Sequence, residues 1–156
     1  MKTILVTGSN GLLGQKITER LSATKQFKLI ATSKGADRFP VKDGYTYAEM
    51  DILDPQNVKE VVGHYKPDAI IHTAAMTNVD TCEDQKELAY QLNVESVKTL
   101  ISVCEEHDIQ LVHLSTDFIF DGAKGPYDEE ADPNPLSYYG QTKVEAENII
   151  KASNCR

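Results

Sequence analysis

Three glycines in the spacing G-x-x-G-x-x-G separate the first strand-like segment of this chain from its first helix-like segment. Thr3–Thr7 is short and rich in β-branched residues, and Gly11–Ser22 carries apolar side chains at helical spacing. A sharp turn from strand to helix favours glycine, because glycine tolerates positive φ. The missing side chain at Gly11 would let a pyrophosphate approach the backbone, and Gly14 would let the helix pack close to the sheet. The free N–H groups at the start of the helix would bind that phosphate.

This loop predicts a dinucleotide-binding α/β domain. Its spacing differs from the commonest fingerprint, G-x-G-x-x-G, but its place between a strand and a helix is the context that such a fingerprint requires. No Gly-Lys-Ser or Gly-Lys-Thr is present, which argues against a P-loop nucleotidase. The alternative is a glycine-rich turn that binds no ligand. The loop residues expected to contact a cofactor are Gly8, Asn10, Gly11, Leu12, Leu13 and Gly14.

Strand-like and helix-like segments alternate along the rest of the chain. We predict strands over Thr3–Thr7, Phe27–Ser33, Tyr45–Met50, Asp68–His72 and Gln110–Ser115, and helices over Gly11–Ser22, Asp54–Tyr65, Asp84–Glu106 and Ser137–Lys151. Right-handed crossovers between such segments give a doubly wound parallel sheet of the Rossmann type, in the strand order 3-2-1-4-5. Ligands bind such sheets at the carboxyl ends of the strands. The long patternless segment 116–136 after the fifth strand is therefore a candidate functional loop.

Composition and charge narrow the class of protein further. The formal net charge of −8 argues against nucleic acid or an anionic membrane as the main partner, because both require a basic surface. No apolar stretch is long enough to span a bilayer, and the N-terminus lacks the pattern of a signal peptide. The cysteines and histidines show no metal-ligand spacing. We therefore expect a cytoplasmic protein without a metal site.

The end of the second predicted strand bears on the choice between NADP and NAD. NAD-binding domains carry an acidic residue about 20 residues after the glycine loop, where it binds the ribose hydroxyls. This chain has Ser33 and Lys34 there, with Arg38 beyond, and no carboxylate before Asp37. A hydroxyl and cations suit the 2′-phosphate of NADP through charge-assisted hydrogen bonds. We predict NADP(H) as the preferred cofactor, with NAD(H) as the alternative; a solvated basic loop is the explanation that involves no ligand.

Tyr139 and Lys143 lie four residues apart on the last predicted helix and therefore share a face. A nearby ammonium favours phenolate and lowers the pKa of a tyrosine. Such a tyrosine can pass a proton to a carbonyl oxygen as hydride reaches the carbon. Ser115 and Thr116 end the fifth strand, where a hydroxyl can hydrogen-bond the same oxygen. The alternatives are a chance pair on a surface helix and hydroxyls that cap the loop backbone.

Together these motifs resemble those of the extended short-chain dehydrogenase/reductase family. The matching motifs are Thr7-Gly8-x-x-Gly11-x-x-Gly14, Asp51-Ile52, His72-Thr73-Ala74-Ala75, Ser115-Thr116-Asp117 and Tyr139-x-x-x-Lys143. Within that family the chain is most similar to the dTDP-4-dehydrorhamnose reductases, over Ala74–Asp80, Leu114–Gly122, Pro126–Glu129 and Pro135–Lys143. The resemblance spans the whole chain. It implies NADPH-dependent reduction of a 4-keto sugar nucleotide.

The resemblance also implies roles for individual residues. Thr116 would bind the substrate carbonyl, Tyr139 would donate the proton and Lys143 would hold the nicotinamide ribose, so that the three form a catalytic triad. Asp51 and Ile52 would flank the adenine. The remaining positions carried over are Ala74, Ala75, Met76 and Asn93 for the cofactor, and Thr77 and Val79 for the sugar.

The chain also departs from that family. Many of its rhamnose-pathway reductases have a glutamine in the glycine loop where this chain has Leu12. This leaves open a related reductase with another substrate, a cofactor-binding regulatory subunit, or a sugar-nucleotide epimerase or dehydratase. The family continues for roughly as many residues again. We therefore expect residues 1–156 to be the cofactor-binding domain, with the substrate-binding part outside it. The full-length protein can be a monomer or a homodimer.

Overall fold

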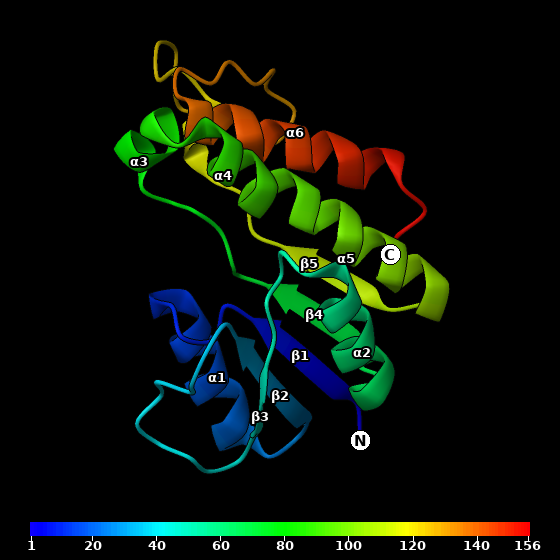
Figure 1. Ribbon diagram of the computed structural model, residues 1–156. Helices are drawn as coiled ribbons and strands as arrows, with labels where there is room; N and C mark the ends of the chain where they lie inside the picture. Colours follow the sequence, from blue (N-terminus) through cyan, green and yellow to red (C-terminus); the bar gives the residue numbers. More distant parts are fainter.

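Five strands make up the sheet of the computed structural model, which describes residues 1–156 (Figure 1). They are β1 (Thr3–Thr7), β2 (Lys28–Ser33), β3 (Thr46–Glu49), β4 (Ala69–His72) and β5 (Gln110–His113). The strands pair in the order β3-β2-β1-β4-β5, and all four pairings are parallel. This confirms the predicted doubly wound sheet and its strand order.

Helices cover both faces of the sheet. They are α1 (Leu12–Thr24), α2 (Pro55–Tyr65), α3 (Val79–Asp84), α4 (Lys86–Tyr90), α5 (Ser96–His107) and α6 (Tyr138–Ala152), with a π-helix η1 (Gln91–Glu95) and a 3-10 turn η2 (Asp117–Ile119). The helices α2 and α5 pack on one face and against each other, α6 lies beyond α5, and α1 lies on the opposite face (Figure 1).

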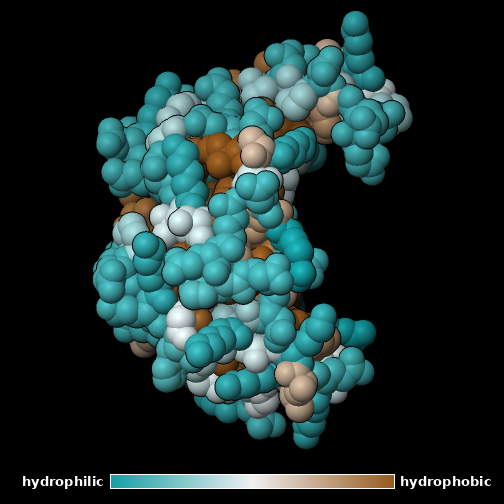
Figure 2. Space-filling model, turned by 90° about the vertical axis from the view of Figure 1, so that its right-hand side faces the viewer, coloured by the Kyte–Doolittle hydropathy of each residue, from teal (hydrophilic) through white to brown (hydrophobic).

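The main hydrophobic core lies between the sheet and the helices α2 and α5. Side chains alternate across a strand, so every second residue of β1, β2 and β4 points into this core. Its buried members are Leu5, Ile30, Met50, Ile52, Val58, Val62, Ile70, Leu100, Val103, Cys104 and Ile109. The end of the molecule where both termini lie is mainly hydrophilic on its surface, with hydrophobic side chains in small areas (Figure 2). No helix combines the length and the apolar character needed to cross a bilayer.

Two predicted helix starts rest on capping side chains. The Asp54 carboxylate accepts hydrogen bonds from the backbone N–H groups of Gln56 and Asn57, at 3.0 and 3.1 Å, and Pro55 takes the first helical position of α2. The Ser137 hydroxyl accepts one from the N–H of Gly140 at 3.1 Å and so begins α6. These local signals were readable from the sequence.

The helix predicted over Asp84–Glu106 is present from Lys86 to His107, but its pitch is not uniform. The chain is broken at Gln85, whose ψ of 55° is not helical, and the helix that follows contains the π-turn η1 between α4 and α5. A π-turn adds one residue to the turn and so shifts the phase of the buried stripe. The fully buried apolar side chains accordingly step five residues across this turn, from Ala89 to Val94. Before this turn the fully buried side chain is Ala89, whereas Leu88 and Leu92 are only half-buried.

Candidate cofactor and active site

The glycine loop leaves room for a ligand at one of its three glycines. Gly8 has a φ of +65°, and a Cβ there would lie 2.7 Å from the backbone nitrogen of Ala74. A Cβ at Gly14 would lie 2.2 Å from the carbonyl oxygen of Gly8. At Gly11 the Cβ would meet a single atom, the Gly8 oxygen at 3.3 Å, and otherwise open space. Gly8 and Gly14 are thus required by the packing of the turn itself, whereas Gly11 opens the backbone to a ligand.

The helix that follows the loop begins without a capping side chain. Its first turn, after Gly11, receives no side-chain hydrogen bond, whereas Asp54, Asn78 and Ser137 cap α2, α3 and α6. Uncapped N–H groups at a helix start bind anions and favour negative charge. The loop and helix therefore fit the pyrophosphate of a dinucleotide.

A cleft of about 450 Å³ opens beside this loop, at the carboxyl ends of β1, β2 and β3; we call it the first cleft. It brings together a large part of the predicted cofactor set, namely Gly8, Gly11, Ser33, Lys34, Asp51, Ile52, Ala74 and Ala75. Met50, Leu53, Thr73, Leu88 and Leu92 complete its wall. Most of this wall is apolar, which suits the ring of an adenine.

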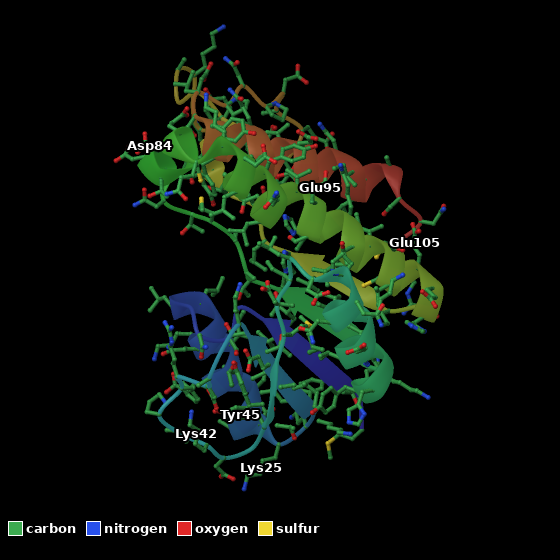
Figure 3. The ribbon with its side chains drawn as sticks, in the orientation of Figure 1. Lys25, Lys42, Tyr45, Asp84, Glu95 and Glu105 are labelled. Carbon is green, nitrogen blue, oxygen red and sulfur yellow. The ribbon has the colours of Figure 1, made fainter.

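Charged groups meet at the mouth of the first cleft. The Lys34 ammonium lies 2.6 Å from the Asp51 carboxylate, and this contact holds the pKa of the Asp51 carboxyl below its ordinary value. Asp37, the first carboxylate after the second strand, is paired with the Lys42 ammonium at 2.8 Å and accepts a hydrogen bond from the Tyr45 hydroxyl at 2.7 Å. Lys42 and Tyr45 lie in the segment between β2 and β3 (Figure 3). Asp37 lines neither cleft described in this section.

Asn10 joins the glycine loop to the segment after β2. Its Nδ2 donates to the carbonyl oxygen of Ala36 at 3.0 Å, and its Oδ1 accepts from the backbone N–H of Arg38 at 2.8 Å. Asn10 thereby fixes the position of the basic segment 34–38 relative to the phosphate-binding turn.

A second cleft, of about 360 Å³, continues from the first toward α6. The two clefts share Gly11, Thr73, Ala74 and Ala75, so these residues form the boundary between them. The other residues of the second cleft are Leu12, Leu13, Gly14, His72, Thr77, Leu114, Ser115, Tyr139 and Lys143. An extended ligand that crosses the glycine loop would therefore reach from Lys34 at one end to Tyr139 at the other.

Tyr139 presents a buried phenol to the second cleft. The residue is 8% exposed, and its ring meets that of Phe118 edge-on, with centroids 6.0 Å apart. Burial raises the pKa of the phenol, and a hydrogen bond with the Thr116 side chain acts in the opposite direction. The expected lowering by Lys143 is not observed: Lys143 is not among the groups that shift this pKa, and its ammonium is bonded to Leu114 and His113. The phenol is therefore protonated at neutral pH, as a proton donor must be.

Lys143 holds an ammonium group in a site that is almost closed to solvent. The residue is 3% exposed, and its Nζ donates to the carbonyl oxygen of Leu114 at 2.5 Å and to Nε2 of His113 at 3.0 Å. Burial lowers the pKa of Lys143 to about 8, against the attraction of Glu147 one turn further along α6. The Leu114 carbonyl and the His113 ring thus hold the ammonium in the wall of the second cleft, which we call its floor.

The remaining predicted residues lie around these clefts. Asn93 is buried beneath the segment after β4: its Oδ1 accepts from the N–H of Met76 at 2.8 Å, and its Nδ2 donates to the carbonyl oxygen of Met76 and to the Thr142 hydroxyl, both at 3.0 Å. Asn93 therefore supports that segment from below and does not line either cleft. Val79 begins α3 and packs against Cys82 and Tyr139.

Sequence reasoning missed part of the wall of the first cleft. Leu88 and Leu92 are four residues apart, the spacing of a buried helical stripe, yet both line this cleft, and Leu92 also packs against the main core. His113, which accepts the hydrogen bond of Lys143, carried no signal beyond its place in a strand.

Comparison with known proteins finds one family that matches the whole chain. The family described as "RmlD substrate binding domain" matches residues 1–156. The dTDP-4-dehydrorhamnose reductase of Aggregatibacter actinomycetemcomitans is 32% identical over 151 residues, which cover 96% of this chain and 47% of that protein. The methionine adenosyltransferase 2 subunit beta of Xenopus laevis is 34% identical over 151 residues, covering 96% of this chain and 43% of that protein.

Solved structures agree with the fold. The dTDP-4-dehydrorhamnose reductase of Bacillus anthracis in complex with NADP is 30% identical, with a TM-score of 0.81, over 96% of this chain and 49% of that one. The UDP-glucose 4-epimerase of Brucella ovis in complex with NAD is 25% identical, with a TM-score of 0.90, over 100% of this chain and 50% of that one. The chain thus spans about half the length of the proteins it matches. By the match over its full length, the chain belongs to the RmlD substrate binding domain family, within the extended short-chain dehydrogenases/reductases.

Proposed function

We propose that residues 1–156 are the cofactor-binding half of an NADPH-dependent reductase that acts on a 4-keto sugar nucleotide. One observation carries the proposal: a protonated phenol, Tyr139, lines a cleft that continues from an uncapped glycine loop. Thr116 is not part of the cleft wall, and its hydroxyl accepts a hydrogen bond from the N–H of Phe118 at 3.2 Å. The similarity to dTDP-4-dehydrorhamnose reductases supports the choice of substrate class.

The side chains suggest how the reaction would proceed. NADPH, when bound, would supply the hydride to the keto carbon. Tyr139 would donate its phenolic proton to the carbonyl oxygen, and Thr116 would hydrogen-bond that oxygen. Lys143 would hold the nicotinamide ribose from the floor of the second cleft, where its two anchoring contacts leave one N–H free. Thr77, at the wall of this cleft, and Val79, beside Tyr139, would lie near the sugar.

The preference for NADPH rests on the mouth of the first cleft. Ser33 and Lys34 line it, and the nearest carboxylate, Asp51, is already paired with Lys34. A 2′-phosphate would offer the ammonium a second anionic partner. The NADP complex of a related reductase supports this choice, and the NAD complex of a related epimerase keeps NAD(H) as the alternative.

The test is an assay of NADPH oxidation with a dTDP-4-keto-6-deoxy sugar, using the natural protein that contains residues 1–156. We expect one NADPH to be consumed for each keto group reduced. A tightly held cofactor without net consumption would instead indicate an epimerase or a dehydratase.

A second candidate function is a cofactor-binding regulatory subunit. The similarity to a protein named as a subunit of methionine adenosyltransferase 2 favours it. Under this alternative the protein binds NADPH, yet the assay above shows no turnover. The presence of Thr116, Tyr139 and Lys143 together favours the reductase.

A further inference from the structure

The Lys143 ammonium has an unusual neighbour for a buried cation, namely a histidine. Its Nζ lies 3.0 Å from Nε2 of His113, the last residue of β5. An ammonium has three N–H donors and no acceptor, so Nε2 must be the acceptor and the ring must be neutral, with its proton on Nδ1. The other contact of the ammonium, at 2.5 Å, is the carbonyl oxygen of Leu114.

A buried histidine, His72, stacks against the partly buried His113. The rings of His113 and His72 stack with centroids 5.5 Å apart and planes 27° from parallel. His72 is 2% exposed, and its Nδ1 lies 2.7 Å from the hydroxyl of Thr7, on the central strand of the sheet. The strand register also places Thr7, His72 and His113 side by side. The acceptor of the ammonium is thus fixed through the sheet itself.

We propose that His113 is a positioning residue, which holds the Lys143 ammonium at the floor of the second cleft through Nε2, with His72 stacked behind it. Two of the three N–H donors of Lys143 are then used by Leu114 and His113. The third is left for a ligand in the second cleft, which Lys143 lines. The inference rests on the proposed function only where it assigns that ligand as the ribose of a cofactor.

Other charged or titratable groups around this contact are few. Glu147, one turn along α6, favours the charged form of Lys143, but its carboxylate is hydrogen-bonded by Ser115 and paired with Lys151 at 3.2 Å. His72 and His113 are both disfavoured as cations by burial and by the nearby Lys143 charge, which lowers the pKa of His72 to about 3 and that of His113 to about 4. Neutral histidines therefore accompany a charged lysine at neutral pH.

The test compares two replacements of His113 with a control. His113→Phe keeps a ring of similar shape but removes the acceptor, and His113→Gln keeps an acceptor. His107→Gln, at the exposed end of α5, is the control. The pKa of Lys143 is measured in the natural protein that contains residues 1–156, by NMR titration of lysine labelled at Cε. We expect His113→Phe to lower this pKa by about one unit, because a hydrogen bond to a charged group is lost. His113→Gln and the control should stay near the wild type.

NADPH titration of the same variants separates this inference from the proposed function. We expect His113→Phe to bind NADPH roughly tenfold more weakly, a loss that corresponds to one hydrogen bond to a charged group. If the wild-type chain does not bind NADPH, the proposed function fails while the shift in the Lys143 pKa still tests His113. An unchanged Lys143 pKa in His113→Phe would overturn the inference.

One measurement needs no variant and so does not depend on the folding of one. The ¹⁵N spectrum of wild-type protein labelled in histidine reports which ring nitrogen of His113 carries the proton. We expect a neutral ring with an unprotonated Nε2. A proton on Nε2 at neutral pH would exclude it as the acceptor and overturn the inference.

Discussion

The Lys34 ammonium lies 2.6 Å from the Asp51 carboxylate, at the mouth of the cleft that would take the adenosine end of a dinucleotide. A bound 2′-phosphate would share this ammonium. We expect Lys34→Ala to weaken NADPH binding roughly fivefold, because a solvent-exposed cation attracts a phosphate only modestly, and to leave NADH binding unchanged. Calorimetric titration with both cofactors measures this. Lys42→Ala is the matched control, because Lys42 pairs with Asp37 outside the cleft.

Asp51→Asn should act in the opposite direction. It removes a negative charge next to the expected phosphate and releases Lys34, so NADPH binding should become tighter while NADH binding does not. Weaker NADPH binding in this variant would contradict the location of the 2′-phosphate at Lys34.

Gly14 in α1 and Gly63 in α2 should respond to alanine with opposite signs. Helix propensity alone favours alanine at both positions by about 1 kcal/mol. At Gly14 the new Cβ would lie 2.2 Å from the Gly8 carbonyl oxygen, whereas at Gly63, in α2, it would meet nothing within 4 Å. We expect Gly14→Ala to lower the free energy of unfolding by about 2 kcal/mol or more and Gly63→Ala to raise it by roughly 0.5 kcal/mol. Urea unfolding checks both, and equal effects would refute the close contact at Gly14.

Replacement of the Tyr139 phenol should separate catalysis from folding. We expect Tyr139→Phe to lower the rate of NADPH oxidation by about 10² to 10⁴, the usual contribution of a general acid, and to spare NADPH binding. Tyr138→Phe is the control, since this ring lies under the Lys86 ammonium, 5.2 Å from its centroid, and outside both clefts. Wild-type turnover in Tyr139→Phe would remove Tyr139 from the mechanism.

The low pKa values of His72 and His113 predict how the free energy of unfolding changes with pH. The pKa of His72 falls from 6.5 to about 3 and that of His113 to about 4 in the folded protein. Below pH 6.5 the unfolded chain therefore binds protons that the folded chain excludes, and the free energy of unfolding decreases as the pH falls. We expect a loss of about 3 kcal/mol between pH 7 and pH 5. Carboxylates such as Asp121, whose pKa is lowered to about 2, act only at lower pH. Constant stability from pH 6.5 to pH 5, in urea unfolding, would show that the two rings are not buried as neutral groups.

The parts of the fold that were predictable from the sequence are those specified by local signals. Two helix starts are marked in the sequence by capping residues, Asp54 with Pro55 and Ser137, because capping acts within a few residues. The glycine loop is also specified locally. A Cβ at Gly14 would clash with the carbonyl oxygen of Gly8, six residues earlier, which explains why glycine is needed there. The sheet order then follows from general rules of handedness and connection.

The parts that were not predictable depend on contacts between distant segments. The pairing of Lys34 with Asp51 joins the ends of two strands, and the contact between His113 and Lys143 joins β5 to α6. The expected effect of Lys143 on the pKa of Tyr139 failed for the same reason. Helical spacing correctly placed Tyr139 and Lys143 on one face of the helix. The burial of the phenol, which raises its pKa, depends on tertiary packing and could not be read from that spacing.

The π-helix η1 has a consequence for how this chain can vary. A helix of uniform pitch presents one buried stripe, so a change on that stripe affects everything it touches. Here the residues before Gln91–Glu95 face a ligand cleft through Leu88, and those after it face the core through Leu100. Substitutions at the cleft end can therefore alter which ligand fits without repacking the interior, so selectivity and foldability can be changed independently along one continuous helix.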